Sequence, residues 1–219
     1  MTAARLEVFD DSDALARAAA DFVGLCARKA IADSGRFTFA VSGGRTPWAM
    51  FEHLTKDDVA WDLIDIYQVD ERVAPTGDPD RNLTHLYESL PPQVTIHAMP
   101  VERADLDAAS LSYANELPAQ FDLIHLGLGP DGHTASLVPG DPALEVADRD
   151  VAVTGPYMGH RRMTLTYPVI NRATEVLWLV AGADKADALR RLQVGDQSIP
   201  AGRVSAPSQV IFADRAATG

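Results

Sequence analysis

The chain has 219 residues, of which 31 are acidic and 19 are lysine or arginine, and its net charge of −12 disfavours nucleic acid and anionic membranes as partners. No run approaches the roughly 20 apolar residues of a membrane span, and no signal-peptide pattern is visible, so we expect a cytoplasmic protein. A hydrophobic content of 47% suits a sizeable core, and the lack of a Ser/Gly/Pro-rich linker predicts one domain over residues 1–219.

The single cysteine, Cys26, excludes a disulfide within the chain. It falls in an apolar pattern with helical spacing, which predicts a buried thiol in a reducing compartment. Lysine is scarce, and the acidic, lysine-poor composition is consistent with a salt-adapted source or with a biased genome. Equal stability in low and multimolar salt would contradict salt adaptation. We expect a monomer or a weak homo-oligomer.

The hydrophobic pattern predicts strands that alternate with helices along the chain. Strands are predicted at residues 5–10, 37–41, 64–69, around 96, 123–126, 176–181 and 209–213. Helices are predicted at residues 12–35, 47–54, 83–90, 106–117 and 185–192, the first capped by Ser12 and ended by Gly35. Two alternating runs, 151–154 and 163–167, predict a small antiparallel excursion. This order implies an α/β fold with a mostly parallel sheet and helices on both faces.

The run from Asp122 to Leu137 is the most informative part of the sequence. An apolar strand ends in a glycine-rich turn that contains Asp131 and His133, and we expect a short helix to begin there and stop before Pro139. The carboxyl ends of strands are where open α/β sheets bind ligands. A carboxylate and an imidazole at that edge suggest a hydrolytic or isomerising site.

The same run contains Gly127-Leu-Gly-Pro-Asp-Gly132, which matches the G-x-G-x-x-G pattern of dinucleotide sites. Asp131 would put a negative charge where a pyrophosphate needs backbone N–H groups, and the expected helix is too short for a dinucleotide fold. We therefore disfavour a nucleotide. A plain strand-to-helix turn would explain the glycines, but not the Asp-Gly-His sequence.

A second glycine-rich turn, at residues 42–47, follows the predicted strand 37–41 and precedes a predicted helix. Its residues are suited to phosphate, since glycines expose backbone N–H groups and the others add hydroxyl donors and a charge. They are Ser42, Gly43, Gly44, Arg45 and Thr46. No Gly-Lys-Ser/Thr follows, so this is not a nucleotide-triphosphate loop. The alternative is a tight turn whose hydroxyls cap the helix.

Asp70-Glu-Arg72 ends another apolar strand, so we expect it at the same sheet edge. A carboxylate there can hold a sugar hydroxyl or act as a base, and Arg72 can bind phosphate. A surface ion pair is the alternative. Arg162 and Lys185 also fall at strand ends, and each is a candidate cation that could equally be a solvated charge.

The sequence lacks the patterns that are typical of metal sites and of serine esterases. The five histidines other than His133 show no paired ligand spacing, so a protein-bound metal is not expected. A G-x-S-x-G elbow is absent from the sequence, which disfavours a serine esterase of the α/β-hydrolase kind.

Four motifs in this order resemble those of the 6-phosphogluconolactonase family. They are Ser42-Gly-Gly-Arg-Thr-Pro47, Asp70-Glu-Arg72, Arg81-Asn82 and the Asp-Gly-His-Thr-Ala-Ser-Leu run within 127–140. The resemblance extends over nearly the whole chain and implies a Rossmann-like three-layer sandwich. The superfamily also contains glucosamine-6-phosphate deaminases and ribose-5-phosphate isomerases.

The deaminases are the nearest alternative. Their corresponding motif resembles Gly-His-Ile-Ala-Phe-Asn-Glu-Pro, with a glutamate where this chain has Val138, and they usually have tyrosine where this chain has Arg72. Both differences favour a lactonase. Arg45 and Val138 also differ from the serine and phenylalanine of many lactonases, which leaves the role of Arg45 open.

The resemblance implies hydrolysis of 6-phospho-D-glucono-1,5-lactone to 6-phospho-D-gluconate in the oxidative pentose phosphate pathway, with no cofactor or metal. His133 would activate water, and Asp131 or Asp70 would orient the imidazole or hold sugar hydroxyls. The expected phosphate- and substrate-binding residues are Ser42, Gly43, Gly44, Arg45, Thr46, Arg72, Asn82, Arg162 and Lys185. A non-catalytic sugar-phosphate sensor is a further alternative, although the α/β pattern leaves no sequence for an output module.

Overall fold

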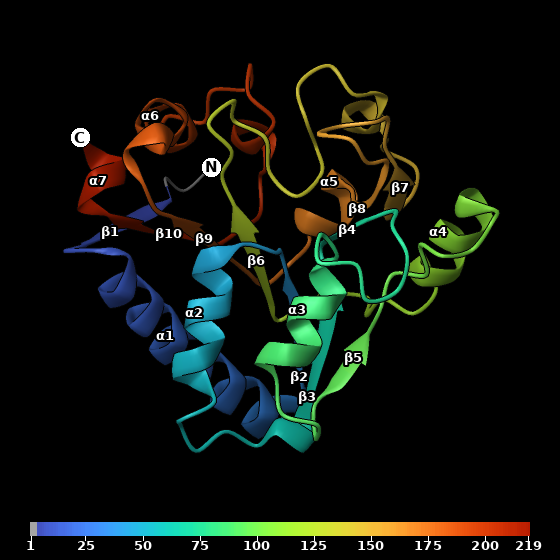
Figure 1. The fold of residues 1–219 in the computed structure, drawn as a ribbon. Coiled ribbons are helices and arrows are strands. Elements are labelled where there is room, and N and C mark those ends of the chain that lie inside the picture. The colour runs from blue at the N-terminus through green and yellow to red at the C-terminus, as the bar shows by residue number, and fades with distance from the viewer. Residues whose placement is uncertain (1–3) are drawn as a thin grey trace.

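The main sheet has seven strands within residues 4–219, the part of the chain that the computed structural model describes (Figure 1). The strands are β1 (Arg5–Phe9), β2 (Phe37–Val41), β3 (Ile64–Gln68), β5 (Thr95–His97), β6 (Leu123–Gly127), β9 (Glu175–Val180) and β10 (Gln209–Asp214). Their order is β1-β10-β9-β6-β2-β3-β5, and all neighbours pair in parallel. The predicted parallel sheet is confirmed.

Helices cover both faces of this sheet, because alternate residues of its buried strands point to opposite sides. In β2, Phe39 packs with α1 (Ser12–Ser34) and α2 (Arg45–Leu54), whereas Ala40 packs on the opposite side with α4 (Leu106–Ala114). The helices are α1 (Ser12–Ser34), α2 (Arg45–Leu54), α3 (Asn82–Ser89), α4 (Leu106–Ala114), α5 (Tyr167–Ile170), α6 (Ala186–Gln193) and α7 (Arg215–Thr218). The expected three-layer α/β fold is confirmed.

A small antiparallel sheet, in the order β4 (Asp70–Arg72), β8 (Arg162–Leu165), β7 (Val151–Val153), lies beside the main one. The predicted excursion forms β7 and β8, but the Asp70–Arg72 segment is unexpectedly its third strand. Val69 joins the two sheets: its N–H donates to Val41 O at 3.0 Å, and its carbonyl accepts from Leu165 N at 2.8 Å. Asp70 is thereby held between the sheets.

The order in which successive strands are added to the main sheet reverses between β2 and β6. These strands are neighbours, but β2 leads to β3 on one side and β6 leads to β9 on the other. The loops at their carboxyl ends therefore diverge and leave a crevice, which is where open α/β sheets bind ligands. Both predicted glycine-rich turns begin at this point.

The helix expected after His133 is absent: residues 128–141, all described, contain turns and the isolated bridge between Thr134 and Leu137. The N–H of Gly129 donates to His133 O at 2.8 Å, and the N–H of Leu137 donates to Thr134 O at 2.9 Å. These short-range bonds use the backbone groups that a helix would need, and Ala135 has a left-handed φ of 52°. The next helical turn is the 3₁₀ segment Pro142–Glu145.

Two smaller expectations about α1 were also wrong. Asp11, not Ser12, caps the helix, because its side chain accepts hydrogen bonds from the N–H groups of Asp13 and Ala14. Cys26 is half-buried rather than buried, although its burial is enough to raise the pKa of the thiol to about 11. A thiol with that pKa is unreactive near neutral pH.

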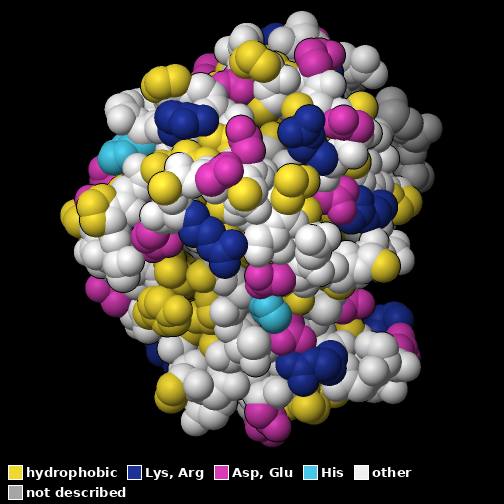
Figure 2. Space-filling model, turned by 90° about the vertical axis from the view of Figure 1, so that its right-hand side faces the viewer, with side chains coloured by type: hydrophobic (Ala, Val, Ile, Leu, Met, Phe, Trp, Pro, Cys, Tyr) yellow, Lys and Arg dark blue, Asp and Glu magenta, His cyan; other side chains and the backbone are white. Residues whose placement is uncertain are grey.

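No helix in the described part of the chain is long and apolar enough to cross a membrane. Figure 2 shows acidic and basic side chains interspersed over one face of the molecule. This mixed pattern differs from the continuous basic stripe that is typical of nucleic-acid-binding surfaces.

Candidate active site

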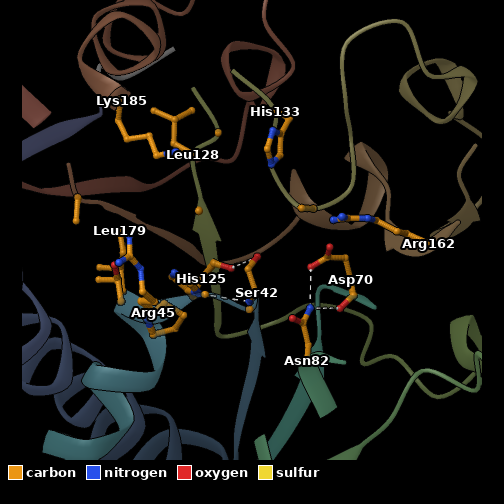
Figure 3. Close-up of a pocket in the computed structure, with 18 of the residues that line it drawn as sticks. Ser42, Arg45, Asp70, Asn82, His125, Leu128, His133, Arg162, Leu179 and Lys185 are labelled. Atoms are coloured by element: carbon orange, nitrogen blue, oxygen red, sulfur yellow. Dashed lines mark hydrogen bonds between the residues drawn. The ribbon is translucent and has the colours of Figure 1, made fainter. Parts of the chain in front are cut away.

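A pocket of about 290 Å³ lies at the carboxyl ends of β2 and β6. It brings together residues from loops that are far apart in the sequence (Figure 3). The predicted site residues that line it are Ser42, Gly43, Gly44, Arg45, Thr46, Asp70, Arg72, Asn82, His133, Arg162 and Lys185. Asp131 is not in the pocket wall, but it contacts His133.

His133 and Asp131 form a close pair. His133 Nδ1 lies 2.6 Å from Asp131 Oδ1, and the same oxygen accepts the N–H of His133 at 3.1 Å. Because a carboxylate only accepts hydrogen bonds, Nδ1 bears the proton, and Nε2 of the neutral ring has a free lone pair. Figure 3 shows the ring pointing into the pocket.

Asp131 keeps its charge in this arrangement. Partial burial acts to raise the pKa of its carboxyl, but the hydrogen bonds from the His133 N–H and ring outweigh it and hold the pKa below its ordinary value. A charged Asp131 can stabilise an imidazolium, so the pair is suited to taking up and returning a proton.

His125 supports the turn at Ser42 from below. Its Nδ1 accepts the N–H of Ser42 at 3.3 Å, and Ser42 Oγ donates to the carbonyl of His125 at 3.2 Å. Burial lowers the pKa of His125 to about 3, so the ring is neutral. Its Nε2 is buried without a hydrogen-bond partner among the described residues. Sequence reasoning missed this pocket residue, whose one signal is its position near the end of β6.

The N-terminus of α2 faces the pocket without a side-chain cap. Gly44 is the N-cap residue and has no side chain, so the first N–H groups of the helix are open to a ligand. Arg45 lies at this end of the pocket, and Lys185 lines the pocket wall beside Leu128 (Figure 3). Lys185 Nζ also pairs with Asp184 Oδ2 at 2.9 Å. A Cβ atom on Gly43 would meet Asn82 Oδ1 at 1.9 Å, so only glycine allows the turn to approach Asn82 this closely.

Asp70 is fixed on the opposite side of the pocket. Ser136 Oγ donates to its Oδ2 at 2.5 Å, and Asn82 Nδ2 donates to its backbone carbonyl at 2.9 Å. Ser136 is itself held, because its N–H donates to Thr164 Oγ1 at 3.2 Å. The sequence left open which carboxylate orients the imidazole of His133; the one that contacts the ring is Asp131, and Asp70 does not.

Two arginines differ in how they are held. Arg72 Nη1 donates to Asp80 O at 2.6 Å and to Asn82 Oδ1 at 3.0 Å, which engages it with the loop before α3. Arg162 is buried with no ion-pair partner within residues 4–219. Burial lowers the pKa of its guanidinium, the nearby charge of Arg72 lowers it further, and Asp70 opposes both effects. Arg162 is therefore a charged group available to an anion.

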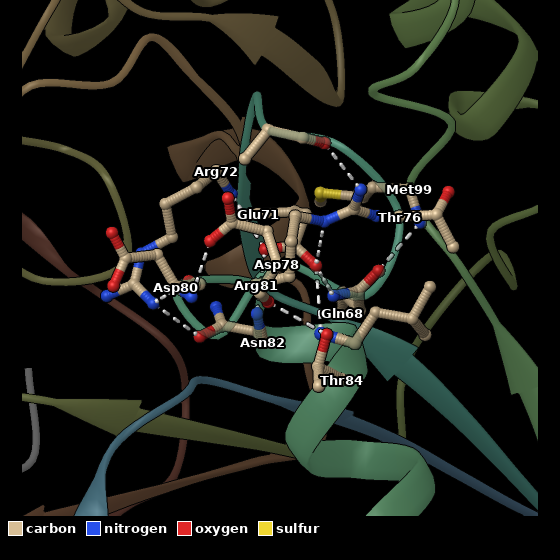
Figure 4. A network of polar contacts seen from close by, with 12 residues as sticks. Gln68, Glu71, Arg72, Thr76, Asp78, Asp80, Arg81, Asn82, Thr84 and Met99 are labelled. Carbon is tan, nitrogen blue, oxygen red and sulfur yellow. Dashed lines mark hydrogen bonds and ion pairs between the residues drawn. The ribbon is translucent and has the colours of Figure 1, made fainter.

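Glu71 supports the start of α3 and does not line the pocket. Its carboxylate accepts the N–H groups of Asn82 and Leu83, both at 2.9 Å, and lies 3.0 Å from Arg81 Nε (Figure 4). Arg81 also pairs with Glu102 at 2.7 Å. This buried network sets the start of α3, and with it the position of Asn82 against Asp70.

Within the described residues, no three His, Cys, Asp or Glu side chains are grouped as a metal site would require. The ionisable side chains of the pocket instead comprise two histidines, one carboxylate and several cations. These groups can bind an anion at one place and transfer a proton at another.

The chain is similar in sequence and in fold to known 6-phosphogluconolactonases. The 6-phosphogluconolactonase of Synechocystis sp. is 41% identical over 203 residues, which cover 84% of this chain and 84% of that protein. The 6-phosphogluconolactonase of Nostoc sp. is 34% identical over 232 residues, which cover 98% and 96%. The crystal structure of 6-phosphogluconolactonase from Thermotoga maritima superposes with a TM-score of 0.87 at 25% identity, covering 96% of this chain and 99% of that one.

The family described as glucosamine-6-phosphate isomerases/6-phosphogluconolactonase matches residues 10–212. The match includes all the glycine-rich turns and polar side chains that form the pocket. The chain therefore belongs to this family, with its full-length similarity on the 6-phosphogluconolactonase side.

Proposed function

We propose that this protein hydrolyses 6-phospho-D-glucono-1,5-lactone to 6-phospho-D-gluconate, a step of the oxidative pentose phosphate pathway. The observation that supports this most is the pairing of His133 with Asp131 in the same pocket as an uncapped helix N-terminus. The first arrangement suits proton transfer, and the second suits a phosphate. A phosphorylated lactone needs both, at opposite ends of one sugar.

The phosphate is bound, in this proposal, by the turn at residues 42–46. The open N–H groups of α2 supply hydrogen-bond donors, and Arg45 and Lys185 supply positive charge from the pocket wall. Arg162 adds a buried cation that has no carboxylate partner within residues 4–219. Arg72 supports the loop of Asn82 as well as lining the pocket.

The lactone lies with its carbonyl near His133. Nε2 of the neutral ring takes a proton from water as the water oxygen attacks the carbonyl carbon. The tetrahedral intermediate then breaks its bond to the ring oxygen, and the imidazolium returns the proton to that oxygen. One water is consumed, His133 ends in its neutral form, and the carboxylic acid that is formed loses its proton to solvent to give the carboxylate. Asp131 stays charged and stabilises the imidazolium. Asp70 accepts hydrogen bonds from sugar hydroxyls, and the side-chain amide of Asn82 donates to them.

The protein is further proposed to act as one domain in the cytoplasm, without metal, cofactor, nucleic acid or membrane. One domain is supported by the pocket itself, because its walls come from segments as far apart as Ser42 and Lys185. Whether it is a monomer or a weak homo-oligomer is decided by sedimentation.

A coupled assay tests the function directly. 6-Phosphogluconate formed from freshly generated lactone is followed with a 6-phosphogluconate dehydrogenase, and the rate is compared with spontaneous opening. We expect clear catalysis, and a fall in turnover of about 10²–10⁴ for His133→Asn. Binding of the lactone without turnover would support the sensor alternative. Release of ammonia from glucosamine 6-phosphate would support the deaminase alternative, which Val138 at the glutamate position disfavours.

A further inference from the structure

We propose that Tyr157 is a positioning residue that fixes the His133–Asp131 pair and Arg162 relative to each other. The inference rests on the proposed function. Tyr157 is not in the pocket wall and belongs to none of the motifs that identify the family. It begins a two-residue hairpin between β7 and β8, in which the N–H of Tyr157 donates to His160 O at 2.9 Å.

The phenol of Tyr157 reaches the catalytic pair. Its hydroxyl lies 3.3 Å from Asp131 Oδ2 and 3.5 Å from His133 Nδ1. Because His133 Nδ1 donates to Asp131 Oδ1, the phenol donates to the other carboxylate oxygen. Both oxygens of Asp131 are then held, which prevents the carboxylate from rotating and so fixes the plane of the imidazole. The two rings also meet edge to face, with centroids 5.4 Å apart.

The same tyrosine holds Arg162. The guanidinium carbon lies 5.2 Å from the centre of the Tyr157 ring, and Nη2 lies 3.5 Å from the backbone carbonyl of Tyr157. Arg162 is only 6% exposed, and its Nε has no hydrogen-bond partner among the described residues. The aromatic face therefore provides a favourable contact for this buried cation, which forms no ion pair within residues 4–219.

The hairpin is held in a strained conformation that serves this placement. Met158 has a φ of 49° and Gly159 a φ of 87°, as a tight hairpin turn requires, although methionine is unfavourable at positive φ. Met158 is 78% exposed, so its own packing does not offset the strain. The offsetting contacts are those of its neighbours: His160 Nε2 meets Asp80 Oδ2 at 3.2 Å, and Tyr157 meets Asp131.

Tyr157→Phe and Tyr157→Ala separate the two contacts. The phenylalanine keeps the ring over Arg162 but loses the bond to Asp131, so we expect kcat to fall about three- to tenfold with KM within about twofold. Without the phenol proton, Asp131 attracts the imidazolium more strongly, so the acidic limb of the pH profile of kcat/KM moves to higher pH. The alanine also frees Arg162, and KM then rises about three- to tenfold.

Tyr87→Phe, on the exposed face of α3, is the matched control and leaves all three parameters unchanged. Unchanged kcat and pH profile in Tyr157→Phe, or identical KM in both Tyr157 variants, would overturn the inference. A parent protein without lactonase activity would instead contradict the proposed function. In that case, NMR titration of the His133 ring tests the role of Tyr157 without any activity. The midpoint of the titration moves to higher pH in Tyr157→Phe if the phenol acts on Asp131, and it does not move if the inference is wrong.

Discussion

Gly129 lies directly against His133: a Cβ atom built on Gly129 would come within 2.0 Å of His133 Nδ1 and 2.7 Å of Asp131 Oδ1. The φ of Gly129 is not positive, so space rather than conformation requires glycine here. Gly129→Ala is therefore expected to displace the catalytic pair and lower kcat by about tenfold or more, because small displacements of reacting groups are costly.

Gly127→Ala is the matched comparison for this prediction. Gly127 is the last residue of β6, two positions before Gly129, but a Cβ atom there would meet nothing within 4 Å. Steady-state kinetics of the two variants should show the larger loss of kcat in Gly129→Ala, with similar melting temperatures in both. Equal losses would mean that the spacing around His133 does not limit the reaction.

Glu71→Gln is expected to destabilise the fold, because it removes the charge that neutralises the buried Arg81. Breaking a buried ion pair of this kind commonly costs about 3–5 kcal/mol. Glu102 contacts the same guanidinium, but its side chain is 41% exposed, so Glu102→Gln should cost less than about 1 kcal/mol. Urea unfolding of both variants measures the difference, and equal costs would show that Glu71 does not anchor α3.

His125 makes stability depend on pH below neutrality. Its pKa is about 3 in the folded protein, whereas a histidine in an unfolded chain titrates near ~6.5. Between these values the unfolded chain binds a proton that the folded chain does not. The contribution to stability is complete above pH ~6.5 and is lost as the pH falls, by up to about 1.4 kcal/mol for each pH unit.

His125→Asn should reduce this slope, since asparagine does not titrate and its carbonyl can still accept the N–H of Ser42. Urea unfolding at pH 7 and pH 5 checks the prediction. His85→Asn, which removes a histidine from the surface of α3, serves as the control for the loss of a histidine outside the core. If the unfolding free energy of His125→Asn depends on pH as strongly as that of the parent protein, His125 is not the source of this pH dependence.

The phosphate site can be tested with two substrates. Arg45→Ala and Lys185→Ala should each raise KM for the phosphorylated lactone about tenfold, because each removes a positive charge from the pocket wall. Neither should alter KM for unphosphorylated glucono-1,5-lactone. Arg72→Ala should raise KM for both lactones, since Arg72 also holds Asn82. An equal effect of Arg45→Ala on both lactones would remove Arg45 from the phosphate site.

The sequence was sufficient for the layers of the fold, because periodicity is a local property. The apolar runs at 37–41 and 123–126 are buried on both faces, and this alone indicates central parallel strands. The strand of Asp70 could not be predicted in the same way. It pairs with Thr164, 94 positions later, and nothing in its own three residues indicates that partner.

The pocket could be predicted as far as its residues follow strand ends, which applies to Ser42, Asp70 and His133. Residues that act through others were missed. In the sequence, His125 looks like any other strand residue, and only the fold shows that its ring accepts the N–H of Ser42. Ser136 contributes to the site only through its hydrogen bond to Asp70, at 2.5 Å. The helix expected after His133 does not form, because the backbone groups of these residues bond within the turns.

The bonds that assemble the pocket join very distant parts of the chain. Ser42 and His125 are 83 residues apart, and Asp70 and Ser136 are 66 apart. Contacts of such long sequence separation close late in folding, since a large loop must be ordered before they form. An isolated segment of this chain therefore cannot contain the complete site. Enzyme activity therefore reports the completion of folding, and should reappear on refolding together with the last step of core assembly.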